Sequence, residues 1–261
     1  MDKGALRLAF SVGSEPTPSA GPSRARLART IAGAVAAGLP ALDLSDSPTP
    51  EAAWTLAREG AGPRWSALGI FVTERPAELT GRALPGQLIV LESPSERRSG
   101  QMPGDSGVRF GELGAAEAGA HSAVRGGAAW VALPGSLLDA PRLIELVAEL
   151  RAAGATVLLT NPHADGRLDG QWLTEGLSPT SRSPRPVDFA ELERSYAPVL
   201  ALAFLTERRG RTLPQAAVAF AVAIGAVPSV RFRDLAQVEA FGTPDRLEPL
   251  TEAELARLAR G

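Results

Sequence analysis

The stretch Thr212–Glu239 reads TLPQAAVAFAVAIGAVPSVRFRDLAQVE, and it decides the fold. Thr212 is a favourable N-cap, and Pro214 falls in the first helical turn, where a missing backbone N–H costs little. The alanine-rich run that follows is apolar on almost every side, which predicts a helix packed against a sheet. Residues 226–230 are a short apolar run and predict a buried strand. The stretch is therefore interpreted as helix, strand, polar loop and second helix.

Two arginines come directly after this predicted strand. Arg231 and Arg233 stand between the strand and the next helix. In an α/β protein this junction is a common place for an anion, because the backbone N–H groups of a helix N-terminus point at it. We therefore expect Arg231 and Arg233 to be the anion-binding residues of the chain.

Eight apolar strand candidates alternate with helices along the 261-residue chain. Parallel strands need helical crossovers, so the alternation predicts a parallel sheet, and eight such units in this length favour a closed barrel. We expect an α/β protein, a (β/α)8 TIM barrel, built as one domain over residues 1–261. Further signals predict a long helix at Val187–Arg208 and helix starts at Asp139 and at Thr251, where Glu254 completes a capping box. The predicted strands are Ala5–Val12, Leu39–Leu44, Leu68–Thr73, Gln87–Leu91, Gly107–Gly111, Ala128–Leu133, Ala155–Thr160 and Ala226–Val230.

The composition excludes several classes of function. The formal net charge is −2, so the chain has no general basic field that would attract nucleic acid. It has no cysteine, which excludes disulfides, a thiolate nucleophile and cysteine-bound metals. No apolar run approaches the roughly 18 residues that span a bilayer, and no signal pattern precedes the first strand. We expect a soluble cytoplasmic protein without nucleic-acid or membrane partners.

Several motifs, in order along nearly the whole chain, resemble those of one enzyme family. Ala37–Asp43 (AGLPALD), Ala129–Asp139 (AWVALPGSLLD) and residues 153–170 resemble motifs of the aldo/keto reductases, as does the stretch at Thr212–Glu239. The resemblance implies the barrel of that family, with NADPH bound at the carboxyl ends of the strands. It also implies a catalytic tetrad of Asp, Tyr, Lys and His, in which the Tyr gives a proton to a carbonyl oxygen.

Only one member of that tetrad is present at its matching position. The Asp matches Asp43, whereas the Tyr position holds Pro48, the Lys position Glu74 and the His position Glu92. Proline has no proton to give, and two carboxylates cannot lower the pKa of a phenol. The single tyrosine and single lysine of the chain lie elsewhere in the sequence, at Tyr196 and Lys3. We therefore do not expect reduction by the mechanism of the family.

The expected cofactor contacts are preserved at one end only. Arg233 matches a phosphate-contacting arginine of the family, Gln237 is kept, and Arg231 stands beside them. The positions that match the nicotinamide contacts lack amide and aromatic side chains; they hold Leu113, Gly114, Ala132 and Gly135. We expect no cofactor, with residual binding of NADP(H) at Arg231, Arg233 and Gln237 as the alternative.

Acidic residues take the tetrad positions, and they suggest another chemistry. Asp43, Glu74 and Glu92 would gather at the mouth of a barrel, with Glu112 as a further candidate and with Asn161, His163 and Arg231 opposite. Crowded carboxylates raise the pKa of at least one of them, which suits acid–base catalysis. We expect Asp43, Glu74, Glu92 and His163 to be catalytic. The same carboxylates with His163 are also of the type that holds Mg²⁺, Mn²⁺ or Zn²⁺, although we assign no metal site.

Two other interpretations stay open at this point. The acidic residues fit equally well as solvated rim residues paired with nearby arginines, and His163 as a loop histidine beside Pro162. The chain would then be a barrel that binds a small-molecule ligand, or a non-catalytic subunit that binds a protein partner. The sequence therefore predicts a divergent aldo/keto-reductase-like protein with a non-reductive role.

Overall fold

A closed barrel of eight parallel strands, paired in chain order, forms the centre of the molecule. The computed structural model describes residues 8–12, 22–44, 50–73, 87–94, 106–168, 196–207, 210–232, 234–241 and 247–261. The predicted (β/α)8 barrel is confirmed. The strands are β1 Ala9–Val12, β2 Ala41–Asp43, β3 Gly69–Val72, β4 Gln87–Glu92, β5 Ser106–Arg109, β6 Trp130–Leu133, β7 Thr156–Leu159 and β8 Val227–Phe232.

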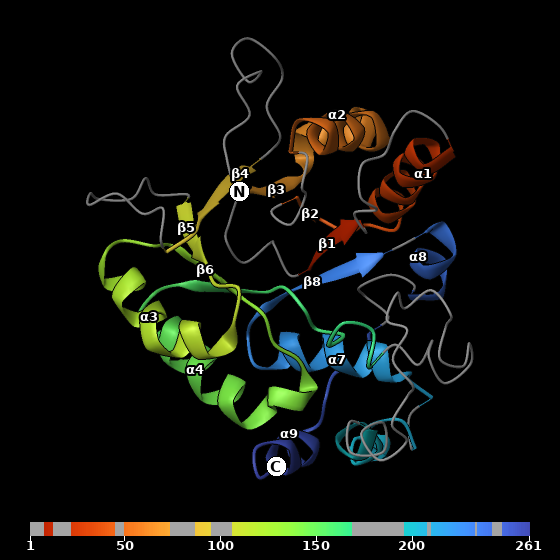
Figure 1. Ribbon diagram of the computed structural model, residues 1–261. Helices are drawn as coiled ribbons and strands as arrows, with labels where there is room; N and C mark the ends of the chain where they lie inside the picture. Colours follow the sequence, from red (N-terminus) through yellow and green to blue (C-terminus); the bar gives the residue numbers. More distant parts are fainter. Residues whose placement is uncertain are drawn as a thin grey trace, which may run out of the picture.

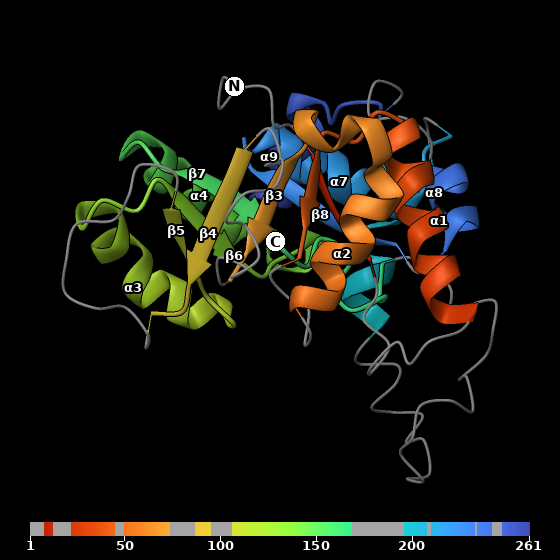
Figure 2. The same cartoon turned by 90° about the horizontal axis from the view of Figure 1, so that it is seen from above.

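Helices surround the strands (Figures 1 and 2). Helices α1, α2 and α8 cover one side of the barrel, and α3, α4 and α7 cover the other (Figure 1). The helices are α1 Pro22–Ala36, α2 Pro50–Ala61, α3 Leu113–Arg125, α4 Ala140–Ala152, α7 Leu213–Ala223, α8 Leu235–Phe241 and α9 Glu252–Leu258. Short 3-10 turns lie at η2 Gly62–Ala67, η4 Leu137–Asp139 and η5 Ala203–Leu205. Within the described ranges, no helix is both long enough and apolar enough to cross a membrane.

The ends of several helices follow the capping signals of the sequence. Thr212 accepts a hydrogen bond from the backbone N–H of Gln215, whose side chain accepts one from Thr212 in return. Thr251 and Glu254 form the same capping box at α9. Asp139 is the N-cap residue of α4, as predicted, but its carboxylate makes no capping bond to α4; it accepts a hydrogen bond from the backbone N–H of Ser136 and so closes η4. Only part of the predicted helix 187–208 is described, and there a helical turn at 196–200 gives way to η5.

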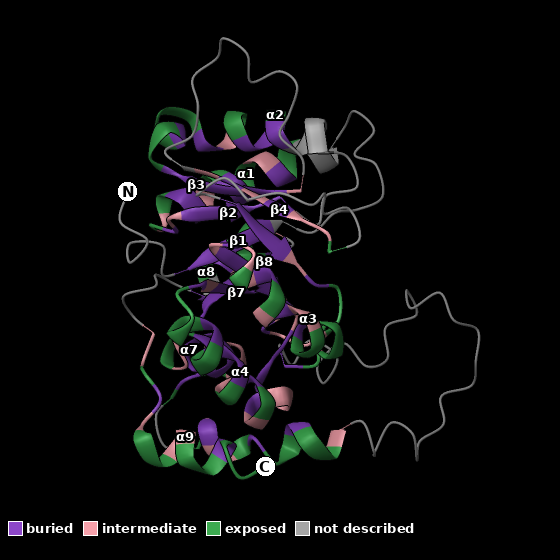
Figure 3. Cartoon of the chain, turned by 90° about the vertical axis from the view of Figure 1, so that its left-hand side faces the viewer, coloured by how far each residue is buried: buried purple, intermediate pink, exposed green. Residues whose placement is uncertain are grey.

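Two apolar layers lie on the two faces of the barrel wall. Side chains on one strand face fill the interior, whereas those on the other face pack against the helices, as the period-two alternation of strands requires. Figure 3 shows this as buried strands within helices whose outer faces are exposed. The interior cluster consists of Ala9, Ala41, Phe71, Ile89, Leu91, Trp130, Ala132, Leu158 and Val227.

One aromatic contact occupies the middle of this interior. The rings of Phe71 and Trp130 meet edge to face, with their centroids 5.1 Å apart. Trp130 is fully buried and lies against Gly107 of β5, where an added Cβ would come within 2.4 Å of the Trp130 carbonyl oxygen. β5 therefore needs a glycine where it runs beside the backbone and Cβ of Trp130. This packing sets the floor of the barrel below its mouth.

Candidate functional site

The strand register decides which side chains reach the mouth of the barrel. Ala9 pairs with Ser229 and Ser11 pairs with Arg231, and Ala9 belongs to the interior cluster. Because neighbouring residues in register share a face, Ser229 and Arg231 also lie on the inner face. The same alternation places Arg109 inward, since it follows Gly107 by two residues and pairs with the interior residue Ala132.

Asp43 is the buried acidic residue of the site. It is only 3% exposed, and its Oδ2 atom accepts a 2.8 Å hydrogen bond from the hydroxyl of Ser229. Nη1 of Arg109 lies 4.0 Å from the same oxygen. A buried carboxylate is stable as an anion when a cation and a hydrogen-bond donor compensate it. Asp43 therefore joins β2, β5 and β8 beneath the mouth.

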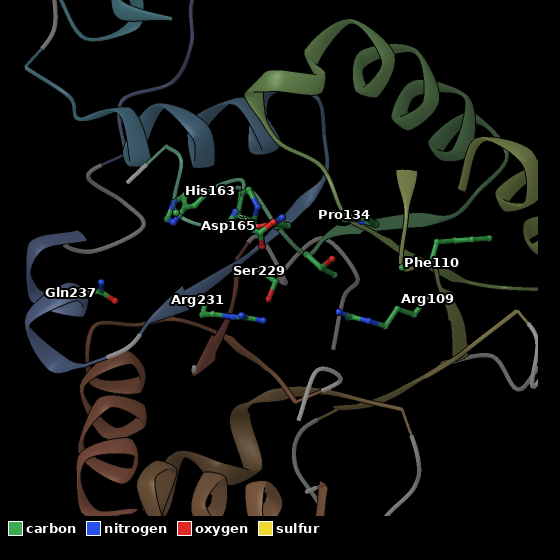
Figure 4. Close-up of a pocket in the computed structure, with 13 residues that line it drawn as sticks. Arg109, Phe110, Pro134, His163, Asp165, Ser229, Arg231 and Gln237 are labelled. Atoms are coloured by element: carbon green, nitrogen blue, oxygen red, sulfur yellow. Dashed lines mark hydrogen bonds between the residues drawn. The ribbon is translucent and has the colours of Figure 1, made fainter. Parts of the chain in front are cut away.

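A cavity of about 460 Å³ opens above this group. Such a volume falls within the roughly 300–1,000 Å³ typical of small-molecule sites. Figure 4 shows Arg109 and Arg231 reaching toward one another from opposite sides, with His163 and Asp165 above Ser229. The cavity is lined by Arg109, Phe110, Gly111, Pro134, Thr160, Asn161, Pro162, His163, Asp165, Gly166, Ser229, Arg231 and Gln237.

The loop after β7 carries His163 into this cavity. Ala164 and Asp165 both have a positive φ, at 52° and 54°, a region that residues with a side chain rarely adopt. The side-chain oxygen of Asn161 accepts a 2.9 Å bond from the backbone N–H of Asp165, and Leu168 is fully buried. These contacts hold two consecutive unfavourable backbone conformations, each of which costs about 1–3 kcal/mol. The surrounding structure therefore imposes the position of the loop.

The chain was compared with known proteins by sequence and by structure, and only the structural comparison found similar proteins. No family model and no curated protein matches the sequence. Among solved structures, an aldo-keto reductase from Bacillus halodurans in its holo form superposes with a TM-score of 0.63 at 14% identity, over 97% of this chain and 91% of that one. The glycerol dehydrogenase of Gluconobacter oxydans gives a TM-score of 0.64 at 15% identity, over 97% and 90%.

The chain has the aldo-keto reductase fold. A further aldo-keto reductase, determined in complex with NADPH, superposes with a TM-score of 0.55 at 14% identity, over 97% of this chain and 83% of that one. The resemblance drawn from the sequence motifs is thereby confirmed for the fold.

Within this aldo-keto reductase fold, part of the predicted site comes together. His163, Arg231, Gln237 and Asn161 line the cavity, and Asp43 contacts two of its lining residues. Glu74 and Arg233 lie outside the described residues. In the described part of the chain, no group of three His, Asp or Glu side chains is placed to hold a metal ion.

The predicted convergence of Glu92 with Asp43 is wrong. Ile89 and Leu91 of β4 point into the barrel, so Glu92 lies on the opposite face of the strand with Leu88 and Val90. It also pairs in register with Val108, which belongs to the outer core. Glu112 is exposed at the start of α3 and does not line the cavity.

Sequence reasoning missed Arg109. Its signal was the alternation within β5, where a two-residue step from Gly107 places Arg109 inward at the carboxyl end of the strand. The mouth that forms in the aldo-keto reductase fold of this chain thus brings guanidinium groups to opposite walls, where the sequence predicted a cluster of carboxylates.

Proposed function

We propose that this barrel binds a small molecule in its mouth and acts in a non-reductive role, without the proton-donating tetrad of the aldo/keto reductases. The observation that carries the proposal is the environment of Asp43. In the family that the sequence resembles, this position pairs with a lysine beside the proton-donating tyrosine. Here Asp43 lies beside Arg109 and Ser229. A guanidinium group does not release its proton in a protein, so Arg109 does not serve as a general acid.

The positions of the missing residues support the same proposal. In the family that the sequence resembles, the tetrad Tyr, Lys and His stand at positions that here hold Pro48, Glu74 and Glu92. Glu92 belongs to the outer face of β4, away from the cavity. Glu74 stays a candidate catalytic residue on the evidence of the sequence alone. His163 is then the favoured acid–base residue, because it lines the cavity and an imidazole transfers protons near neutral pH.

The described residues suit the phosphate end of NADP(H) better than the nicotinamide end. At the nicotinamide end, Ala132 and Gly135 are buried and offer no side-chain amide or ring, and a Cβ at Gly135 would meet Leu143 at 2.8 Å. These residues therefore do not provide a binding site for the nicotinamide ring, and no step of the proposed function uses that ring. At the phosphate end, Arg231 and Gln237 line the cavity. These two residues, with the NADPH complex of one structural neighbour, favour residual NADP(H)-dependent oxidoreduction as the second candidate.

Cofactor titration tests the proposal against that second candidate. We expect the chain to leave NADPH unoxidised in the presence of aldehydes and ketones. NADPH oxidation that depends on a carbonyl compound would overturn the non-reductive role. A fluorescence titration of NADPH, run in parallel, separates binding of the cofactor from its turnover.

The two histidines of the chain provide a matched pair for the positive test. A small-molecule library is screened for compounds that raise the melting temperature. We expect His163→Gln to remove or weaken that stabilisation. His121→Gln should retain it, because His121 lies on α3 and pairs with Glu149 at 3.1 Å, away from the cavity. Stabilisation that is the same in both variants would show that the cavity is not the binding site.

A further inference from the structure

Ser229 connects the cavity with the buried acidic group beneath it. Its side chain lines the 460 Å³ cavity, and the residue is only 1% exposed. It lies on the inner face of β8, and Figure 4 shows it below His163 and Asp165. Its hydroxyl donates the 2.8 Å hydrogen bond to Oδ2 of Asp43. The hydroxyl of Ser229 therefore has one side bonded to Asp43 and another side on the cavity.

The chemistry of Asp43 sets the direction of this hydrogen bond. A hydroxyl has one proton and two acceptor lone pairs, whereas an ionised carboxylate only accepts. Nη1 of Arg109 lies 4.0 Å from the same Oδ2 atom, so a cation compensates the buried carboxylate. If the Ser229 proton turned toward the cavity, Asp43 would lose a charge-assisted hydrogen bond, and a bond to a neutral ligand is weaker than that. The proton of Ser229 is therefore held by Asp43.

The oxygen of Ser229 is consequently an acceptor toward the cavity. In the part of the chain that the structure describes, its bond to Asp43 is the one side-chain hydrogen bond that Ser229 makes. The other lone pairs are thus left for a molecule in the cavity. A ligand that covers this buried oxygen without a donor loses affinity, because the oxygen then has no partner. The arginines that line the cavity can only donate, so Ser229 makes the opposite demand on a ligand.

We infer that Ser229 is a specificity-determining residue, which selects ligands that place an N–H or O–H group against its oxygen. This inference rests on the proposed function, because it concerns recognition in the same cavity. Asp43 is the positioning residue, since it acts on a ligand through the orientation of the Ser229 hydroxyl. The bond joins β2 to β8, so closure of the barrel sets the polarity of this part of the cavity.

Titrations followed by nuclear magnetic resonance, with two pairs of small neutral compounds, test this inference. Pyrazole and N-methylpyrazole differ by one N–H donor, and phenol and anisole differ by one O–H donor. We expect the parent protein to bind the donor compound of each pair more tightly. Ser229→Ala should weaken the binding of pyrazole and phenol roughly 3- to 10-fold, the loss of a neutral hydrogen bond, without weakening that of the methylated compounds. Ser122→Ala, at an exposed serine of α3, should leave all the affinities unchanged.

A second substitution tests the positioning role of Asp43. Asp43→Ala releases the proton of Ser229, so the hydroxyl is then able to donate to the ligand as well. N-methylpyrazole, which accepts at its free ring nitrogen, should gain affinity relative to pyrazole. A purely structural role of Asp43 would lower both affinities together, and that result would contradict the positioning role. Circular dichroism checks the folding of each variant, and Ser229→Ala is the decisive one because it removes a single oxygen atom.

The carboxylate of Asp165 lines the same cavity and is a second acceptor, so the source of a donor preference must be assigned by substitution. Asp165→Gly removes this carboxylate and suits the positive φ of 54°. A preference that persists in Ser229→Ala and disappears in Asp165→Gly would overturn the inference. Equal affinities within each pair in the parent protein would also overturn it, as would the absence of binding by every compound.

The inference and the proposed function fail separately. If library compounds stabilise the protein through His163, and Ser229→Ala leaves the donor preference unchanged, the inference is wrong and the proposed function stands. If NADPH reduces carbonyl compounds, and the donor preference is lost in Ser229→Ala, the inference stands and the non-reductive role is wrong.

Discussion

Arg211 provides a sharp test of the structure, because its charge is buried and fully engaged. Its side chain is 3% exposed and forms an ion pair with Glu254, whose side chain is 15% exposed. Nε donates a 2.8 Å hydrogen bond to the carbonyl of Leu205, and Nη1 donates a 3.2 Å bond to the carbonyl of Pro249. One side chain thus connects η5, the segment before α9 and the capping box of α9.

The substitution Arg211→Met keeps the aliphatic part of the side chain and removes all three contacts. It leaves the Glu254 carboxylate without its cation and two carbonyl groups without their donor. Removal of one partner from a buried ion pair costs about 3–5 kcal/mol of unfolding free energy. Urea denaturation followed by circular dichroism measures the loss. With a slope near 3 kcal/mol per molar urea, the midpoint should fall by roughly 1–1.7 M.

The chain contains a matched control for this experiment. Arg142 and Glu117 form an ion pair of the same type on the surface, with side chains that are 54% and 36% exposed. Exposed pairs contribute about 0–1 kcal/mol, so Arg142→Met should shift the midpoint by no more than about 0.3 M. Equal losses in Arg211→Met and Arg142→Met would refute the reasoning, since burial is the difference between the two pairs.

Two further predictions follow from local geometry. Burial raises the pKa of Glu254, but the bonds from Thr251 and the charge of Arg211 outweigh it, so the net pKa lies below its ordinary value of 4.5. A lowered folded-state pKa stabilises the protein above about pH 4.5, and the contribution is lost as pH falls through the folded-state pKa; Glu254→Gln should flatten this part of a plot of urea midpoint against pH. Ala164→Gly should raise the unfolding free energy by about 0.5–1 kcal/mol, because glycine adopts the positive φ of 52° without strain. Ala148→Gly, in the middle of α4, should lower it by about 1 kcal/mol, and losses in both variants would contradict the strained conformation of the β7 loop.

The fold could be predicted because its signals are local. The alternation of apolar strands and helices along the chain required parallel crossovers, and Thr212 with Pro214 marked the start of α7 correctly. The sequence also predicted the capping box at Thr251 correctly. Asp139 marked the start of α4 correctly, but its carboxylate bonds to Ser136, three positions earlier, and closes η4 in place of capping α4.

The site was harder to predict because it depends on contacts between distant strands. The hydrogen bond between Ser229 and Asp43 joins residues 186 positions apart, which become neighbours only when the barrel closes. No window of local sequence reports such a contact. The wrong prediction that Glu92 points into the mouth could have been avoided. Because Ile89 and Leu91 point inward, the alternation of β4 places Glu92 on the outer face.

The layered interior bears on the proposal that the mouth of this barrel has a non-reductive role. Phe71, Trp130 and Leu158 are fully buried in the interior cluster, and the edge-to-face contact between Phe71 and Trp130 connects β3 with β6. Apolar burial of this kind supplies most of the stability of a barrel, whereas an exposed charged residue such as Arg231 contributes little. A substitution at Arg231 is therefore expected to change what the barrel binds at a small cost in stability. This separation of the packed interior from the mouth is why the fold identifies a structural class, while Arg109, Arg231 and His163 must identify the ligand and the chemistry.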